Sequence, residues 1–338
     1  MESLIRAGGL QGFEALIKEL GQDPYALLER HGIAAASLAN VDELISMTDA
    51  TELLEESALL CQCPTLGLQL AARQDAGLLG AVAMIIRSAP TLQQTIKSAV
   101  RYLFLHSPAM EFSMKPESDL YAGCVTPSLT MHQTEFATQR QAVDAALGYM
   151  WRFLQLLTDE PVPLKGVSLH HAADGNEHAY RRFFGVPIHF EQAYAGLHFP
   201  KEALSLPLKT FDTRFHQLAL EQISAAAHKG KLSVADQVRR AIPRTLGEQR
   251  ATKQIIADML GMHPRTLQRR LSAENARFEQ IQEDIYKQAA LRFLTETDIP
   301  LTRLSDILGF KNPSAFTRSA KRWFEKSPSV LRKEARRH

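Results

Sequence analysis

The stretch Leu301–Phe324 reads LTRLSDILGFKNPSAFTRSAKRWF, and it repeats a pattern that Thr252–Leu271, TKQIIADMLGMHPRTLQRRL, shows earlier in the chain. In both, apolar residues at helical spacing are followed by a glycine, a short turn and a proline, namely Gly261 and Pro264, then Gly309 and Pro313. Glycine ends a helix where a positive φ is needed, and proline is favoured in the first turn of the next helix. Two helix-turn-helix motifs are therefore predicted, over about 252–272 and 301–324.

A continuous helical pattern lies between the two motifs, over 278–295. Its apolar stripe consists of Ile281, Ile285, Ala289 and Phe293. At about 1.5 Å per residue this helix is roughly 27 Å long, and successive major grooves on one face of B-DNA lie about 34 Å apart. A rigid helix of this length can therefore hold the second helix of each motif in neighbouring grooves.

Charge is distributed unevenly along the chain. Residues 231–338 contain 22 lysines and arginines against 12 aspartates and glutamates, a net charge of +10, whereas the first 230 residues contain 17 against 25, a net charge of −8. The overall charge of +2 therefore conceals a basic C-terminal end on an acidic body. A basic domain of this kind is typical of proteins that bind nucleic-acid phosphates.

The second motif and its tail, LGFKNPSAFTRSAKRWFEKSPSVLR at 308–332, resemble the signature of the DNA-binding domain of AraC/XylS transcription regulators. This resemblance implies an all-α DNA-binding domain over 248–338, with two helix-turn-helix motifs joined by a linker helix. The chain departs from the family's pattern where an alanine, a phenylalanine and a glycine are usual, at Ser305, Ala320 and Glu325. We expect these departures to affect local packing.

Polar and basic side chains on the second helix of each motif are the candidate DNA contacts. In the first motif Leu267 and Leu271 face inward, which leaves outward Arg265, Thr266, Gln268 and Arg269. Arginine can donate two parallel hydrogen bonds to guanine, and glutamine can pair with adenine in the same way. The resemblance implies that Arg265, Gln268 and Arg269 reach base edges. The alternative is a basic face that contacts only phosphates or solvent.

The second motif presents a similar set on the face opposite its core, namely Ser314, Thr317, Arg318 and Lys321. The resemblance implies that Arg318 reads a base, whereas Lys321 and Arg322 are predicted to contact phosphates. Asn312 is predicted to cap the helix and to contact a phosphate through the helix N-terminus.

Residues 1–208 are predicted to form a separate α+β domain, which a connecting segment with helical content follows over 209–247. Helical patterns fill Leu10 to Tyr102, with caps predicted at Asp23, at Thr48 or Asp49, and at Thr91. Strands are predicted at 111–115 and 120–126, which form a hairpin, and at 166–171, 187–191 and 196–200; helices are predicted at 134–157 and 176–184.

Three segments of this domain resemble the so-called arabinose-binding N-terminal domain of one branch of the same regulators. They are VSLHHAAD at 167–174, YRRFFGVPIHF at 180–190 and GLHFPKEALSLPL at 196–208. The resemblance implies a domain that senses a small molecule and mediates self-association, for which the helix over 134–157 is a candidate surface. The motif is mainly a folding signature, so its name does not identify a ligand.

An effector pocket is predicted among the apolar, aromatic and methionine residues between Leu78 and Phe153. The polar candidates for holding a carboxylate there are Arg87, Arg101, His106 and Arg140. The alternative is that the apolar side chains form the core and the polar ones lie on helix surfaces.

No metal or cofactor site is predicted. Cys61 and Cys63 lack a second pair of ligands at zinc spacing, which favours buried structural cysteines. His170 and His171 are adjacent on a predicted strand, so we expect them to point to opposite faces, where they cannot chelate one ion together.

Composition excludes several protein classes. A chain of 338 residues with 45% hydrophobic and 22% charged residues is typical of a soluble protein with two or more domains. No apolar run approaches the roughly 20 residues of a membrane span, and charged residues interrupt any signal peptide. Three cysteines are too few for a disulfide framework, which indicates a cytoplasmic protein.

These patterns, together with the resemblance, predict a non-enzymatic transcription regulator that binds promoter DNA in response to a small-molecule effector. The expected partners are double-stranded DNA and the effector; the resemblance adds a second copy of the chain and RNA polymerase. Two alternatives stay open: a DNA-binding regulator without a ligand, and an enzyme fused to a DNA-binding module, which needs an activated cysteine at Cys63. The identity of the effector, the operator and the direction of regulation stay open too.

Overall fold

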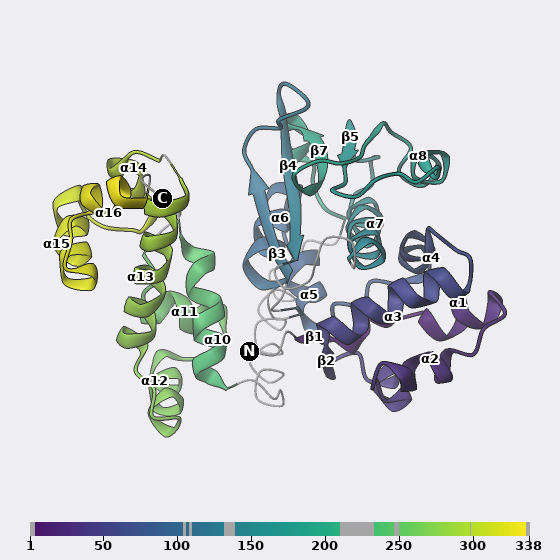
Figure 1. The fold of residues 1–338 in the computed structure, drawn as a ribbon, viewed down its shortest axis with the longest axis horizontal. Coiled ribbons are helices and arrows are strands. Elements are labelled where there is room, and N and C mark those ends of the chain that lie inside the picture. Colours follow the sequence, from purple (N-terminus) through teal and green to yellow (C-terminus); the bar gives the residue numbers. More distant parts are fainter. Residues whose placement is uncertain are drawn as a thin grey trace. The chain divides into compact units, whose positions relative to one another are not determined.

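The computed structural model describes residues 4–103, 106–107, 110–131, 139–209, 233–246, 250–297 and 299–335. The chain divides into two compact units, Met1–Ala226 and Ala227–His338, and each is described by itself (Figure 1). The N-terminal unit combines helices with a sheet and the C-terminal unit is helical, which confirms the predicted fold class. Across the described ranges, none of the helices has the length and apolar character that a membrane crossing requires.

Helices form the first part of the N-terminal unit. They are α1 Phe13–Glu19, α2 Pro24–Arg30, α3 Met47–Leu60, α4 Leu66–Arg73, α5 Ala81–Arg87 and α6 Leu92–Tyr102. A short antiparallel pair, β1 Leu4–Arg6 and β2 Leu44–Ser46, precedes α3. Asp23 and Thr91 cap α2 and α6 as predicted. The cap of α3 is Ser46 instead of Thr48 or Asp49, because the Ser46 hydroxyl accepts a hydrogen bond from the Asp49 amide at 3.2 Å.

A five-stranded sheet follows, in the order β3-β4-β7-β5-β6. Its strands are β3 Met110–Lys115, β4 Cys124–Met131, β5 Gly166–Ser168, β6 Ile188–His189 and β7 Ala195–Pro200. Strands β5 and β6 run parallel, and the other neighbouring pairs run antiparallel.

The second strand of the predicted hairpin was placed too early, because β4 occupies 124–131 and not 120–126. The turn is longer than expected since the Ser118 hydroxyl accepts hydrogen bonds from the amides of Leu120 and Tyr121, which withholds them from the strand ladder. The strand also continues past Pro127, although proline lacks the amide hydrogen that a central strand needs. The ladder between β4 and β7 accommodates this proline by pairing residues on either side of Thr126 and Pro127.

Two more helices complete the N-terminal unit, α7 Arg140–Leu157 and α8 Glu177–Phe184. The predicted start of α7, near Thr134, lies outside the described residues. Helix α7 packs closely against α4: a Cβ atom on Gly67 would lie only 2.2 Å from the Gln141 carbonyl oxygen, and one on Gly148 only 2.9 Å from the Ala71 Cβ. Glycine at both positions therefore allows α4 and α7 to share the core of this unit.

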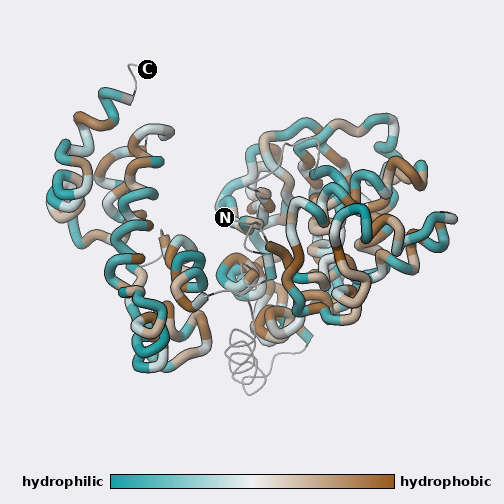
Figure 2. The backbone as a smooth tube through the Cα atoms, turned by 60° about the horizontal axis from the view of Figure 1, so that its bottom comes forward, coloured by the Kyte–Doolittle hydropathy of each residue, from teal (hydrophilic) through white to brown (hydrophobic). Residues whose placement is uncertain are grey.

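The C-terminal unit consists of α10 Val234–Ala241, α11 Lys253–Met259, α12 Pro264–Ala273, α13 Phe278–Glu296, α14 Leu301–Ile307, α15 Pro313–Phe324 and α16 Pro328–Ala335. The pairs α11–α12 and α14–α15 form the two helix-turn-helix motifs, and α13 is the helix that joins them. Gly261 and Gly309 adopt positive φ values of 61° and 66° after α11 and α14, as predicted. Hydrophobic and hydrophilic segments alternate along these helices (Figure 2), as amphipathic helices around small cores require.

The three departures from the family's pattern have local consequences. Ser305 is fully buried, and its hydroxyl has no hydrogen-bond partner within the described ranges. Ala320 is fully buried in a cluster with Phe310 and Phe316. Glu325 ends α15 with φ at 58°, in the left-handed region that favours glycine. The second motif keeps its fold, with one unsatisfied hydroxyl and one strained residue.

Candidate nucleic-acid interface and ligand cavity

Helix α12 presents the predicted DNA contacts of the first motif on its outer face. Leu267 and Leu271 form the inner face and are fully buried. The outer face carries two exposed arginines and two half-buried polar residues, namely Arg265, Arg269, Thr266 and Gln268. His263 caps the helix, because its Nδ1 accepts a hydrogen bond from the Arg265 amide at 3.2 Å. Both arginines therefore lie on the side of α12 that faces away from the core.

Helix α15 has the same organisation in the second motif. Its outer face carries three exposed candidates and one half-buried threonine, namely Ser314, Arg318, Lys321 and Thr317. Asn312 caps the helix as predicted, because its Oδ1 accepts a hydrogen bond from the Ala315 amide at 2.8 Å. The Thr317 hydroxyl donates to the Pro313 carbonyl at 2.9 Å, so it is already engaged within the helix.

Arg322 is held by a carboxylate on α13. Its Nη2 lies 2.5 Å from Oε1 of Glu283, and Nε1 of Trp323 donates to the same oxygen at 2.7 Å. The hydrogen bond from Trp323, and then that from Arg322, lowers the pKa of Glu283. A phosphate that binds Arg322 must therefore compete with Glu283, and Glu283 fixes the end of α15 on α13.

Helix α13 sets the separation of the two motifs. It has 19 residues and is about 28 Å long, and Figure 1 shows α12 near one end and α15 near the other. Arg250, which precedes α11, contacts α13 and the second motif, since its guanidinium lies 5.7 Å from the ring centre of Tyr286 and 5.3 Å from that of Phe310. A Cβ atom on Gly309 would lie 2.9 Å from the Arg250 Cα. Close packing therefore holds the segment that leads into α11 against α13 and the turn of the second motif.

Glu274, directly after α12, holds the N-terminus of α10. Its two carboxylate oxygens accept hydrogen bonds from the amides of Val234 and Ala235, at 2.7 and 2.8 Å. Helix α10 is thereby anchored to the first motif. Sequence reasoning missed both Glu274 and Glu283, because their partners lie about 40 residues away and local spacing carries no signal for such contacts.

The N-terminal unit encloses a cavity of about 110 Å³. Its wall comes from α3, α6, β3, β4 and α7 and is mostly apolar, with Leu54, Ile96, Phe112, Met150, Phe153 and Leu154 as examples. The region predicted for an effector pocket, from Leu78 to Phe153, supplies only part of this wall. Residues between Ile5 and Leu54 supply another part, which sequence reasoning missed because they lie far from that region in the chain.

Most polar side chains in the wall of this cavity already have hydrogen-bond partners, as Thr51, Gln74, Thr95 and Ser113 do. Two polar atoms differ: Nδ1 of His106 and the hydroxyl of Tyr149 are buried and have no partner among the residues that the structure describes. Burial, and then the charge of Arg6, lowers the pKa of His106 to about 3. Burial raises the pKa of Tyr149. Both groups are therefore neutral near pH 7 and available to a ligand.

Of the four predicted effector contacts, His106 lines the cavity, and Arg87, Arg101 and Arg140 are not among its described lining residues. Arg87 is half-buried near the end of α5. The guanidinium of Arg101 lies 5.6 Å from the ring centre of Tyr102. Arg140 donates hydrogen bonds to Asp174, to the Tyr180 hydroxyl and to the Ala173 carbonyl. The structure therefore brings one of the four to the cavity and uses Arg140 to join α7 to the segment before α8.

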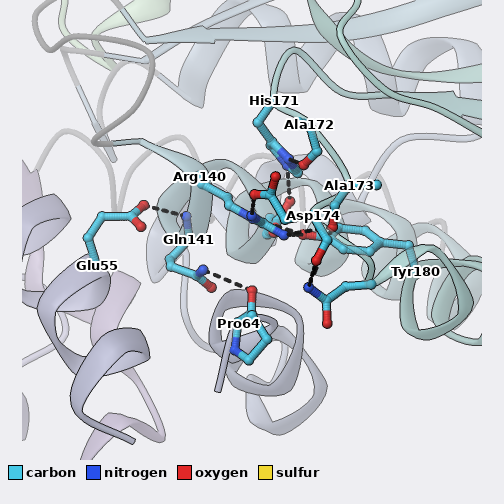
Figure 3. A network of polar contacts seen from close by, with 11 residues as sticks. Glu55, Pro64, Arg140, Gln141, His171, Ala172, Ala173, Asp174 and Tyr180 are labelled. Carbon is cyan, nitrogen blue, oxygen red and sulfur yellow. Dashed lines mark hydrogen bonds and ion pairs between the residues drawn. The ribbon is translucent and has the colours of Figure 1, made fainter. Parts of the chain in front are cut away.

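A buried polar network joins α7 to α8 (Figure 3). Asp144 has a fully buried side chain and accepts hydrogen bonds from the Tyr180 hydroxyl at 2.5 Å and from Nε2 of His171 at 2.9 Å. Burial lowers the pKa of His171, but the hydrogen bond and the charge of Asp144 outweigh it, so the net pKa shift is upward. Burial, followed by the charge of Asp144, raises the pKa of Tyr180. We interpret this network as structural, since it holds His171 and α8 against α7.

The placement of the adjacent histidines on a strand was wrong. Strand β5 ends at Ser168, so His170 and His171 follow the strand, and their ring centres lie 5.6 Å apart. The alternation of side chains along a strand therefore does not apply to them. Within the described part of the chain, no three potential metal ligands gather in one place.

The cysteines of the N-terminal unit lack the signs of an activated nucleophile. Burial raises the pKa of Cys61 and of Cys63, whereas a reactive cysteine needs a lowered pKa. Cys63 is buried, and its sulfur accepts a hydrogen bond from Gln69 Nε2 at 3.1 Å. The packing of these thiols supports a structural role.

Comparison with known proteins identifies relatives over both units. Residues 21–208 match the family model described as the arabinose-binding domain of AraC transcription regulator, N-terminal, and residues 256–334 match a helix-turn-helix domain. The HTH-type transcriptional regulator VirS of Mycobacterium tuberculosis is 31% identical over 330 residues, which cover 98% of this chain and 96% of VirS. The ornithine utilization regulator of Pseudomonas aeruginosa is 25% identical over 319 residues, covering 94% and 93%. The crystal structure of the transcriptional regulator CdpR from Pseudomonas aeruginosa aligns with a TM-score of 0.47 and 19% identity, over 94% of this chain and 97% of that one.

Proposed function

The chain belongs to the AraC family of helix-turn-helix transcription regulators, and on that premise we propose that α12 and α15 enter two successive major grooves of one promoter site. The observation that carries this proposal is the pair of basic second helices joined through one 19-residue helix. A length of about 28 Å for α13 suits the roughly 34 Å between successive grooves. The net charge of +10 over residues 231–338 supplies the attraction to phosphates.

Specific roles follow for the outer faces of these helices. We assign base contacts to Arg265, Arg269 and Arg318, because their exposed side chains lie on the outer faces and their donors match guanine edges. Gln268 is half-buried with its Oε1 buried, so it must turn outward to pair with adenine. Thr266, Ser314 and Thr317 flank these residues, and Lys321 and Arg322 contact phosphates. Asn312 adds the amides at the N-terminus of α15 to a phosphate contact.

We propose that the effector binds in the apolar cavity of the N-terminal unit. Two buried polar atoms without partners, on His106 and Tyr149, support a ligand there, because such groups are usually hydrogen-bonded. The effector acts by binding one arrangement of the protein more tightly than another, since only a difference in affinity shifts a population.

Further proposals rest on family membership: the protein acts in the cytoplasm as a homodimer and contacts RNA polymerase at its promoter. Helix α7 is a poor dimer surface, contrary to the sequence-based expectation, because most of its side chains are buried. Light scattering that gives the mass of one chain, at concentrations that saturate DNA, would exclude the dimer.

The test is binding of the full-length protein to the DNA upstream of its own gene, with a shuffled fragment as control, over a range of salt concentrations. We expect a clear preference for the upstream fragment and a steep loss of affinity as salt rises. Equal affinity for both fragments, with and without a metabolite extract, would contradict site-specific regulation from this region.

A regulator without a ligand is the second candidate. It predicts that no small molecule changes the melting temperature, whereas the unpartnered atoms in the cavity favour a ligand. An enzyme that uses Cys63 is disfavoured by the buried thiol with its raised pKa. Labelling of Cys63 in the native protein as fast as in the unfolded chain would reverse that judgement.

A further inference from the structure

The cavity of the N-terminal unit restricts the chemical class of its ligand. The inference depends on the proposed function only in equating this ligand with the effector. The starting observation is a wall of apolar side chains in which two neutral polar groups, Nδ1 of His106 and the hydroxyl of Tyr149, are buried without partners. His106 is 6% exposed and Tyr149 is 8% exposed, so solvent does not satisfy them.

A sugar does not match this wall. Each hydroxyl group that leaves water for an apolar cavity needs a new hydrogen-bond partner. The wall offers two unpartnered groups in its described part, while Thr51, Gln74 and Thr95 are bonded to main-chain carbonyls. Arabinose carries a hydroxyl on almost every carbon, so most of its hydroxyl groups would lose water without compensation.

A carboxylate does not match it either. A buried carboxylate needs a cation or several donors close by. Arg6 is the cationic side chain in the described part of the wall, and its Nη1 already lies 2.6 Å from Oδ1 of Asp42. His106 has a strongly lowered pKa and stays uncharged at neutral pH.

The size of the cavity sets the size of the ligand. Its volume is about 110 Å³, and apolar cavities of about 150 Å³ take up benzene. Since this cavity is smaller than the one that takes up benzene, a molecule with about six carbon atoms is the upper limit of what fits without repacking the wall.

We propose that the cavity binds a small neutral molecule of at most about six carbons, mainly apolar, whose single hydroxyl, carbonyl or amide group hydrogen-bonds to His106 and Tyr149. The hydroxyl of Tyr149 can donate to such a group, and the neutral imidazole can donate or accept at Nδ1 according to its tautomer. One polar group on the ligand thus satisfies the two atoms that the fold leaves without partners.

The test uses the full-length protein without DNA and four probes: 1-hexanol, hexanoate, L-arabinose and benzene. At about ten times its Kd, 1-hexanol should raise the melting temperature of the N-terminal unit by about 2–5 °C. Hexanoate at pH 7.5 and L-arabinose should give no saturable shift at the same concentrations. A shift with arabinose or hexanoate equal to that with hexanol, or no saturable shift with hexanol, would overturn the proposal.

Variants separate hydrogen bonding from packing. Tyr149→Phe removes only the hydroxyl, so it should weaken the binding of 1-hexanol by roughly 2- to 12-fold and leave the binding of benzene unchanged. Tyr25→Phe makes the same chemical change at an exposed site and should alter neither probe. Equal losses of affinity for benzene and hexanol in Tyr149→Phe, or unchanged hexanol affinity in both Tyr149→Phe and His106→Leu, would show that His106 and Tyr149 do not hydrogen-bond to the ligand.

The hexanol and upstream-DNA binding experiments, made on the same protein, distinguish the ligand class from the regulatory function. If hexanol binds as predicted but the upstream DNA is not preferred, the regulatory proposal fails and the cavity assignment stands. If the upstream DNA is preferred and hexanol does not bind, the ligand class is wrong and the regulatory proposal stands.

Discussion

Tyr180→Phe tests whether the buried network between α7 and α8 stabilises the N-terminal unit. The substitution removes the hydroxyl that donates to Asp144 at 2.5 Å and keeps the ring, which packs edge-on against Phe190 with ring centres 5.3 Å apart. Asp144 is fully buried, and of the hydrogen bonds from Tyr180 and His171 it keeps only the one from His171 in this variant. A lost hydrogen bond to a buried charged group costs about 1.5–3 kcal/mol.

Urea unfolding measures this loss in the correct unit. The protein has two tryptophans, Trp151 in the N-terminal unit and Trp323 in the C-terminal unit. In a Trp323→Phe background the fluorescence of Trp151 reports on the N-terminal unit alone. With a urea m value of about 2–3 kcal/mol per M, Tyr180→Phe should lower the midpoint by about 0.5–1.5 M.

The matched control is Tyr25→Phe. The Tyr25 hydroxyl also donates to a carboxylate at 2.5 Å, on Glu14, but Tyr25 is 46% exposed. Water replaces such a bond, so we expect a loss of at most about 0.5 kcal/mol. Equal losses for the two variants would refute the reasoning that burial makes the Asp144 bond strong.

Three other predictions concern DNA binding, pH and the end of α15. Arg269→Ala and Arg318→Ala should each weaken binding to the specific site by about 1–3 kcal/mol and relax base preference; equal losses on random DNA would show that they contact only phosphates. Folding raises the pKa of His171. Its pairing with Asp144 therefore stabilises the N-terminal unit fully below the unfolded pKa of about 6.5, and this stabilisation is lost as the pH rises through the folded pKa. Urea midpoints should fall over that range and should fall less in Asp144→Asn. Glu325→Gly should stabilise the C-terminal unit by about 0.5–1 kcal/mol because φ is 58°; a lower thermal midpoint of that unit would contradict this.

Local chemistry made the C-terminal unit predictable. A cap such as Asn312 acts on the third residue after it, and a glycine such as Gly309 acts on the turn that contains it. Such signals lie within a few neighbouring residues, so both helix-turn-helix motifs followed from the sequence. The family resemblance added which faces meet DNA, and those residue assignments stay predictions.

The parts that sequence reasoning missed depend on contacts between distant residues. The wall of the cavity combines side chains from Ile5 to Leu154, and no spacing rule connects them. The start of β4 depends on hydrogen bonds to the Ser118 hydroxyl, and the proline inside it depends on a gap in the ladder to β7. Arg140 looked available for a carboxylate ligand because its partner Asp174 lies 34 residues further along the chain.

The grip of Glu274 on α10 has a mechanical consequence. The two amides that Glu274 holds, those of Val234 and Ala235, belong to the first turn of α10. A force on the chain at this point therefore acts on the hydrogen bonds from these amides to the Glu274 carboxylate, which follows α12 directly. Tension on the chain at Val234 would therefore reach the end of α12 through Glu274.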